Sequence, residues 1–245
     1  MKLHSTKGIV LRVVKYGETS LIVTVYTELF GIQSFLVNGF RVASKKGSGK
    51  ANYFQPAAIL DLIVYHNDLK NLQRIKEFKW AHLYKNILFD VIVNSVALFM
   101  IELLQKTIRE PEANPDLFYF IEDALIHLDE ADPAVVANFP LFFASQLTNF
   151  FGFRISDEYN ESHSFLDLQE GAFVKEQPLH PHWLGEPYSQ LVSQFLRVMQ
   201  PAELKEIRIN QEKRRILMNA YQTFYALHVQ DFGTMKTLAV LQEVL

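Results

Sequence analysis

Residues 16–50 of the chain read YGETSLIVTVYTELFGIQSFLVNGFRVASKKGSGK. Leu21, Val23 and Val25 alternate with Ile22, Thr24 and Tyr26, and a second β-like run spans 31–40 after the turn sequence Glu-Leu-Phe-Gly. A period of two, with many β-branched and aromatic residues, is typical of strands. The segment ends in a loop with four cations and no acidic residue: Arg41, Lys45, Lys46 and Lys50. We therefore expect two strands joined by a turn, followed by a basic loop.

Three further strands are predicted on either side of this segment. Residues 9–16 alternate in the same way before it. After the basic loop, residues 53–65 form a fourth run, with Pro56 near its start, where a missing backbone N–H is tolerated. Residues 69–76 form a shorter fifth run. Five consecutive strands in this length predict a small antiparallel barrel of the OB type.

From Trp80 onward the apolar period changes to that of helices. Residues 152–187 are rich in glycine and proline and are expected to be irregular. Helices are expected over residues 80–107 (as one helix or two), 115–128, 133–151, 188–199, 211–229 and 234–244. The predicted class is α+β: a five-stranded OB-type barrel domain at 1–80, followed by an all-helical domain at 81–245 with an irregular insertion around 152–187.

Charge is distributed unevenly along the chain. The formal net charge of the 245 residues is −3. Residues 1–80 hold twelve Lys and Arg against five Asp and Glu, a net charge of +7, whereas the remainder carries −10. Such an asymmetry predicts a polyanionic partner, such as a nucleic acid, for the first module.

Several classes of protein are disfavoured by composition. The chain has no cysteine, which excludes disulfides, thiolate zinc sites and cysteine nucleophiles and fits a reducing compartment. Its first residues lack the apolar core of a signal peptide. The most apolar later stretch, residues 87–104, is interrupted by Asp90 and Asn94, which favours a buried helix over a membrane span. We expect a cytoplasmic protein without a membrane partner.

The sequence GSGK at the end of the basic loop does not fit a phosphate-binding P-loop. That motif needs glycine where Ser44 stands and serine or threonine where Ala51 stands, and a helix should follow it. Here a strand is expected instead. A basic loop between strands can still contact phosphates through its charge alone.

Histidines in the predicted insertion leave an alternative open. His163, His180 and His182 lie near several carboxylates, so a metal-assisted hydrolase is one interpretation, and surface histidines on a proline-fixed loop are the other. Acidic pairs such as Glu122-Asp123 are expected to be solvated. No segment combines a nucleophile, a base and an orienting partner, so we expect no enzyme, no cofactor and no metal.

Cations and aromatic residues are predicted to share faces of the barrel strands. Arg12 and Tyr16 fall on one face of their strand, and Thr24 and Tyr26 on one face of the next. Such faces suit single-stranded nucleic acid, although solubility alone could also explain the lysines. An RNA-binding OB adaptor is a further alternative. The candidate DNA-binding residues are Arg12, Lys15, Tyr16, Arg41, Lys45, Lys46, Lys50, Lys70, Arg74 and Lys76, of which Lys70, Arg74 and Lys76 are expected on one face of the fifth strand.

Several segments resemble the RecO family of bacterial recombination mediators. They are GIVLR (8–12), YGETSLIV (16–23), YTELFG (26–31) and NGFR (38–41), together with Phe232-Gly233 and Lys236-Thr237-Leu238 near the other end. LTNFFGF (147–153) resembles the segment before the family's zinc-binding insertion. Many relatives carry four cysteines there, and this chain has none. We therefore expect packing of Phe165, Leu168, Phe173 and Trp183 to hold the insertion.

The resemblance implies functions that composition alone does not. It implies binding of single- and double-stranded DNA, annealing of complementary strands, and action with RecR to load RecA on strands covered by single-stranded DNA-binding protein (SSB), near the nucleoid. It also implies binding of the acidic C-terminal tail of SSB on the helical domain. A hydrophobic pocket with a cationic rim would suit that tail. The candidate residues are Lys213, Arg214, Arg215, Leu217, Tyr221 and Phe224, and the competing interpretation is an ordinary cationic first turn of a surface helix.

Overall fold

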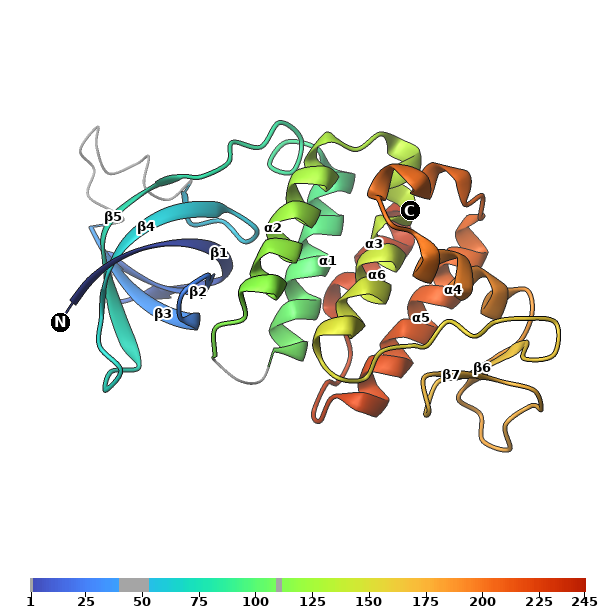
Figure 1. Cartoon of the computed structure of the whole chain (residues 1–245). Coiled ribbons are helices and arrows are strands. Elements are labelled where there is room, and N and C mark those ends of the chain that lie inside the picture. The colour runs from blue at the N-terminus through green and yellow to red at the C-terminus, as the bar shows by residue number, and fades with distance from the viewer. Residues whose placement is uncertain (1, 40–52, 109–111) are drawn as a thin grey trace. The chain divides into compact units, whose positions relative to one another are not determined.

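The computed structural model describes residues 2–39, 53–108 and 112–245 (Figure 1). Contacts divide the chain into two compact units, Met1–Lys85 with Ile108–Ile126, and Asn86–Thr107 with His127–Leu245. The domain boundary expected after residue 80 stays a prediction. The four cations of the predicted basic loop, Arg41, Lys45, Lys46 and Lys50, lie outside the described residues.

Five strands of the first unit form a closed barrel in the order β1-β2-β3-β5-β4 (Figure 1). All neighbouring pairs are antiparallel except β3 and β5, which are parallel. The strands are β1 (Lys2–Tyr16), β2 (Ser20–Thr27), β3 (Gly31–Asn38), β4 (Ile59–His66) and β5 (Leu72–Trp80). With the helices described below, this arrangement confirms the α+β class.

The long strand β1 closes the barrel because it pairs with two partners. Its first half pairs with β4 and its second half with β2, and a register shift lies between Val10 and Arg12. Gly8 lies where the two pairings overlap. A Cβ atom on Gly8 would come within 2.5 Å of a Val25 methyl and 2.9 Å of a Leu62 methyl, so the glycine permits this close packing.

Two of the expected barrel strands begin elsewhere. The strand expected from residue 53 begins at Ile59, because Pro56 lacks an N–H and Ala57 takes a left-handed φ of 73°. Ala57 N instead donates to Val10 O at 2.8 Å. The strand expected over residues 69–76 spans Leu72–Trp80, because a hydrogen-bonded turn occupies the residues before it.

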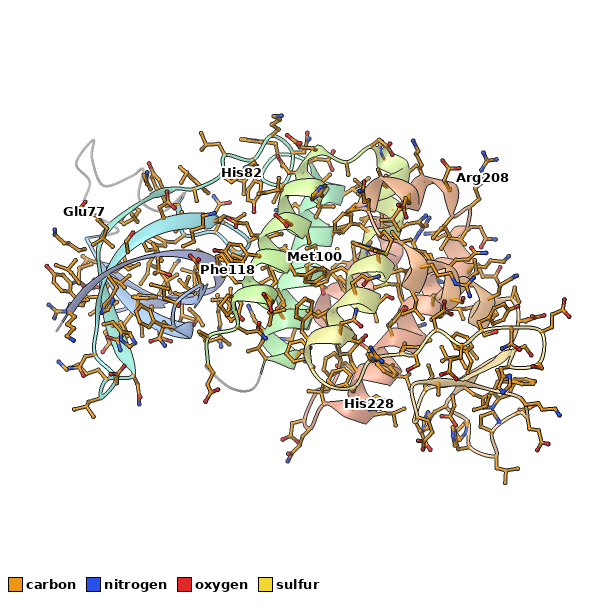
Figure 2. The ribbon with its side chains drawn as sticks, viewed as in Figure 1. Glu77, His82, Met100, Phe118, Arg208 and His228 are labelled. Carbon is orange, nitrogen blue, oxygen red and sulfur yellow. The ribbon has the colours of Figure 1, made fainter. Side chains whose placement is uncertain are left out.

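Helix α2 (Pro115–Glu130) contributes its residues up to Ile126 to the first unit. Lys7 Nζ donates to Glu122 Oε1 at 2.8 Å, and the rings of Tyr26 and Phe118 lie 6.1 Å apart (Figure 2). Glu122 is buried, so the expectation that it is solvated was wrong. The hydrogen bond with Glu122 overcomes the desolvation of Lys7 and raises the pKa of its ammonium group.

The second unit is built around helix α3. Eleven of its fifteen residues are buried, and it contacts α1, α4 and α5. Along the described parts of the chain, no helix is long and apolar enough to cross a membrane. The helices are α1 (Val91–Thr107), α3 (Pro133–Leu147), α4 (Tyr188–Arg197), α5 (Gln211–His228) and α6 (Lys236–Val244), with 3₁₀ turns η2 (Thr148–Phe150) and η3 (Pro201–Glu206) (Figure 1).

The first of these helices begins later than expected. Residues 80–107 were expected to be helical, but Trp80 ends β5 and α1 starts at Val91. Asp90 fixes this start, because its Oδ1 accepts hydrogen bonds from Ile92 N at 2.8 Å and Val93 N at 2.9 Å.

Residues 152–187, expected to be irregular, contain a small sheet in the order β7-β6-β8. Its strands are β6 (Phe165–Asp167), β7 (Ala172–Val174) and β8 (Trp183–Leu184). The expected aromatic packing is present: the rings of Phe165 and Trp183 meet edge to face at 5.5 Å, and Leu168 and Phe173 are buried. Strands of two or three residues are too short to show a period in the sequence, which is why this sheet was missed.

Candidate nucleic-acid interface

Near the end of β1, Arg12 and Tyr16 lie on the exposed face as expected, but the alternation stops there because Lys15 is exposed as well. Arg12, Val14 and Tyr16 are exposed, whereas Val13 packs against the barrel core. The register pairs Arg12 with Thr24 and Tyr16 with Ser20 on β2. Tyr16 is 55% exposed and can stack on a flat ligand.

The neighbouring strand face expected around Thr24 and Tyr26 is different. Tyr26 is only 1% exposed, and its hydroxyl donates to Asn114 O at 3.2 Å. Burial raises the pKa of Tyr26 to about 12, against a smaller opposing effect of that hydrogen bond. Tyr26 is therefore a core residue of the first unit and is not available to stack on bases.

The cations around β5 do not share one regular strand face. Arg74 is exposed on β5, where the register pairs it with Leu36 and with Tyr65. Lys70 lies in the turn before the strand. Lys76 falls at a register shift and pairs with Glu77, another exposed residue, at 3.2 Å (Figure 2). The single face expected for these three cations was wrong because a bulge interrupts the alternation.

Four candidate cations of the barrel have no acidic partner among the residues that the structure describes. Within residues 2–39, 53–108 and 112–245, no carboxylate lies at ion-pair distance from the side chains of Arg12, Lys15, Lys70 or Arg74, all of which are exposed. By contrast, Lys7 and Lys79 are paired with Glu122 and Asp61. Exposed cations without carboxylate partners can exchange counterions for phosphate groups.

Near these cations, Phe30 and His66 form an aromatic pair that sequence reasoning missed. Their rings stack with centroids 3.9 Å apart and an interplanar angle of 9°. They come from the β2–β3 turn and the end of β4, 36 positions apart in the chain. No local pattern in the sequence could indicate this contact.

On the second unit, the candidate residues for the SSB tail occupy two different environments. Leu217, Tyr221 and Phe224 are buried in the helical core, so they do not form an open apolar wall. A small hollow beside the candidate cations has other apolar neighbours. It is lined by Pro140, Gln211, Arg214, Arg215, Met218, Leu241, Gln242 and Leu245.

The three candidate cations also differ in their burial and in their hydrogen bonds. Arg214 Nη1 donates to Leu245 O at 2.7 Å, and burial lowers the pKa of its guanidinium group. Arg215 Nη2 donates to Gln242 O at 3.3 Å while the residue remains exposed, and Lys213 is half-buried. Lys213 and Arg215 are therefore the cations most accessible to an acidic peptide.

The histidines of the β6–β8 region do not assemble a metal site. His180 Nε2 lies 3.1 Å from Asp167 Oδ2, and its Nδ1 accepts from His182 N at 3.2 Å, so neither ring nitrogen is free for a metal. His163 is held by Asn160 and Ser162. Among the residues that the structure describes, no three His, Asp or Glu side chains gather where they could hold a metal ion.

His228, at the end of α5, has a structural contact with the same region. Its Nε2 lies 3.0 Å from Leu168 O, and its ring stacks on Phe153 at 5.4 Å (Figure 2). Together with the Asp167–His180 contact, this arrangement uses histidines to hold the β6–β8 sheet in place. The alternative interpretation, a metal-assisted hydrolase that uses these histidines, has no support in the geometry of the described residues.

These features define an α+β protein with a five-stranded barrel, exposed cations on the barrel surface, and a helical unit with a small cation-rimmed hollow. The first 84 residues match the family "Recombination protein O N terminal", and residues 88–237 match "Recombination protein O C terminal". The chain therefore belongs to the RecO family, a family of DNA repair and recombination proteins.

Full-length relatives agree with this assignment. The chain is 32% identical over 244 residues to the DNA repair protein RecO of Phocaeicola vulgatus, covering 99% of both chains. It is 34% identical over 240 residues to the DNA repair protein RecO of Flavobacterium psychrophilum, covering 98% of both. A relative from Bacteroides fragilis with the same name is 34% identical over 244 residues, covering 99% of both.

Proposed function

We propose that the protein is a DNA-binding recombination mediator whose barrel is of the OB type and contacts the phosphate backbone. The observation that carries this proposal is the set of exposed barrel cations that have no carboxylate partner within the described part of this RecO-family chain: Arg12, Lys15, Lys70 and Arg74. Exposed Tyr16 adds a surface for stacking on bases. The strand order and the double pairing of β1 support the OB assignment.

In this role the protein binds single- and double-stranded DNA and anneals complementary strands. It acts with RecR to load RecA onto strands covered by SSB, and the helical unit binds the acidic SSB tail. Annealing and RecA loading require that DNA strands and partner proteins are positioned, and they need no bond-breaking chemistry. We therefore assign no catalytic group. This proposal rests on family membership for the partners and on the surface cations for DNA.

The test is DNA binding by the full chain, measured against salt for single strands and duplexes. The triple variant Arg12→Ala/Lys15→Ala/Arg74→Ala should weaken binding to all sequences alike and reduce the salt slope by about 0.7 per lost contact on single strands. Lys175→Ala is the control, because it removes an exposed cation outside the barrel. An unchanged salt slope in the triple variant would show that these three residues do not contact DNA. If the wild type bound RNA but not DNA, an RNA-binding adaptor would be favoured instead.

A further inference from the structure

A polar groove opens on the first unit beside the part of β3 that precedes its pairing with β5. The pairing covers only Ser34–Leu36 on β3, and the groove lies next to Gln33 at its edge. Its volume is about 420 Å³, within the roughly 300–1,000 Å³ of sites that hold small organic molecules. The residues that matter here are Phe30, Gln33, Ser34, His66, Lys70 and Asn71.

The β4–β5 turn forms one wall of this groove, and buried Gln73 holds it. Gln73 is 2% exposed; its Oε1 accepts from Asn67 N at 3.1 Å, and its Nε2 donates to Asn67 O at 2.9 Å and Lys70 O at 2.6 Å. Leu69 N donates to Asn67 Oδ1 at 3.0 Å. The turn is thus ordered in advance, which lowers the entropic cost of binding.

Three consecutive side chains of the turn, those of Asp68, Leu69 and Lys70, are presented to solvent. Leu69 is 93% exposed, and Lys70 is exposed without an acidic partner in the described chain. The stacked pair of Phe30 and His66 lines the groove beneath them. Asp68, the one carboxylate among the described residues that line the groove, lies 3.3 Å from His66 Nδ1. A ligand here meets the Lys70 cation, the Asp68 carboxylate beside His66, an aromatic wall and neutral hydrogen-bonding groups.

We infer that this groove is a subsite for one unpaired nucleotide of a bound DNA strand. Lys70 contacts the phosphate, Gln33, Ser34 and Asn71 offer hydrogen bonds to the edge of the base, and Leu69 packs against the neighbouring base. The inference rests on the proposed function, because it requires that the barrel binds DNA. A duplex does not use the site, because its bases are stacked and their Watson–Crick edges are already paired.

The experiment compares the full chain with the double variant Gln33→Ala/Asn71→Ala, which changes no charge. Affinity for a labelled oligothymidine should fall about 5- to 30-fold, while affinity for a blunt duplex should change less than twofold. Gln169→Ala/Gln177→Ala, outside the first unit, is the matched control and should bind both as the wild type does. Equal melting temperatures establish that the variants are folded.

The side chain of Gln33 also donates to Phe30 O, so its substitution removes a structural hydrogen bond as well. A second variant therefore tests the subsite without changing Gln33. Leu69→Ala alters only an exposed side chain, and it should weaken single-strand binding several-fold without affecting the duplex. If the wild type binds no single-stranded DNA, the proposed function itself fails. If the wild type binds single-stranded DNA but the variants keep their affinity for both single strands and duplex, the DNA function stands and the subsite is wrong. The same holds if the variants lose affinity for single strands and duplex equally.

Discussion

The carboxylate of Glu102 on α1 shows how one residue stabilises the start of another helix. It accepts hydrogen bonds from Lys236 N at 2.9 Å, Thr237 N at 2.8 Å and Thr237 Oγ1 at 2.6 Å. Burial alone would raise its pKa, but these bonds and nearby Lys106 together hold the pKa of Glu102 below its ordinary value of 4.5. The Lys-Thr-Leu segment that resembles the family is thus part of a helix-to-helix contact.

We predict that Glu102→Gln lowers the free energy of unfolding by about 1–2 kcal/mol at pH 7, because an ionised acceptor of three hydrogen bonds is lost. The folded pKa lies below the unfolded one, so this stability is fully present above pH 4.5 and disappears as pH falls through the folded pKa. Thermal melts from pH 7 to pH 3 are the measurement. The variant should show a weaker loss in acid than the wild type, and Glu176→Gln, on an exposed residue, should match the wild type.

A second residue-scale prediction concerns the ion pair between Lys7 and Glu122. Lys7→Met leaves a buried carboxylate without its cation, so we expect a loss of about 1–3 kcal/mol. Chemical denaturation with a probe in the first unit is the measurement, and Lys2→Met is the control because Lys2 is exposed. Equal stability of the two variants would show that the Lys7–Glu122 pair does not stabilise the folded protein.

At the scale of elements, the β6–β8 sheet depends on side-chain contacts that need no metal. Asp167 Oδ1 accepts from Gln169 N and Glu170 N, while Oδ2 contacts His180. We predict that Asp167→Ala speeds hydrogen exchange across residues 165–184, whereas prolonged chelation changes neither exchange nor melting temperature. A loss of stability on chelation that zinc restores would contradict this, because structural zinc contributes folding free energy directly.

The elements also show what the sequence could predict. The strands β1, β2 and β3 and the start of α3 after Asp132 follow local signals and were predicted correctly, but the expected alternation fails where residues 8–11 of β1 and Tyr26 of β2 are buried. The start of α1 was missed because apolar residues around it hide the Asp90 cap. The cations of the candidate interface follow from composition, but the groove does not. It joins residues 30–34 to residues 66–73, and only the pairing of β3 with β5 brings them together.

At the scale of the whole molecule, the charge split predicts a division of labour. The acidic remainder of the chain disfavours DNA, while Lys213 and Arg215 can still accept an acidic peptide beside an apolar hollow. We predict that Lys213→Ala/Arg215→Ala weakens binding of an SSB-tail peptide at least fivefold and leaves DNA affinity within twofold.

Peptide titration and DNA binding in parallel are the measurements. Arg214 is kept intact because it holds Leu245. If the variant binds the peptide as the wild type does, the peptide site lies elsewhere on the helical unit.

The interleaving of the two units has a consequence for how the chain folds as it is synthesised. The first unit needs residues 108–126, yet α1 of the second unit precedes them in sequence. The barrel can close once β5 has been synthesised. The hydrogen bonds of Lys7 with Glu122 and of Tyr26 with Asn114 can form only after residues 114–122 have also been synthesised. Meanwhile the apolar α1 has no α3 to cover it, since α3 follows at Pro133. We therefore expect nascent chains of about 110 residues to expose apolar surface and to be the stage at which chaperones bind and aggregation begins.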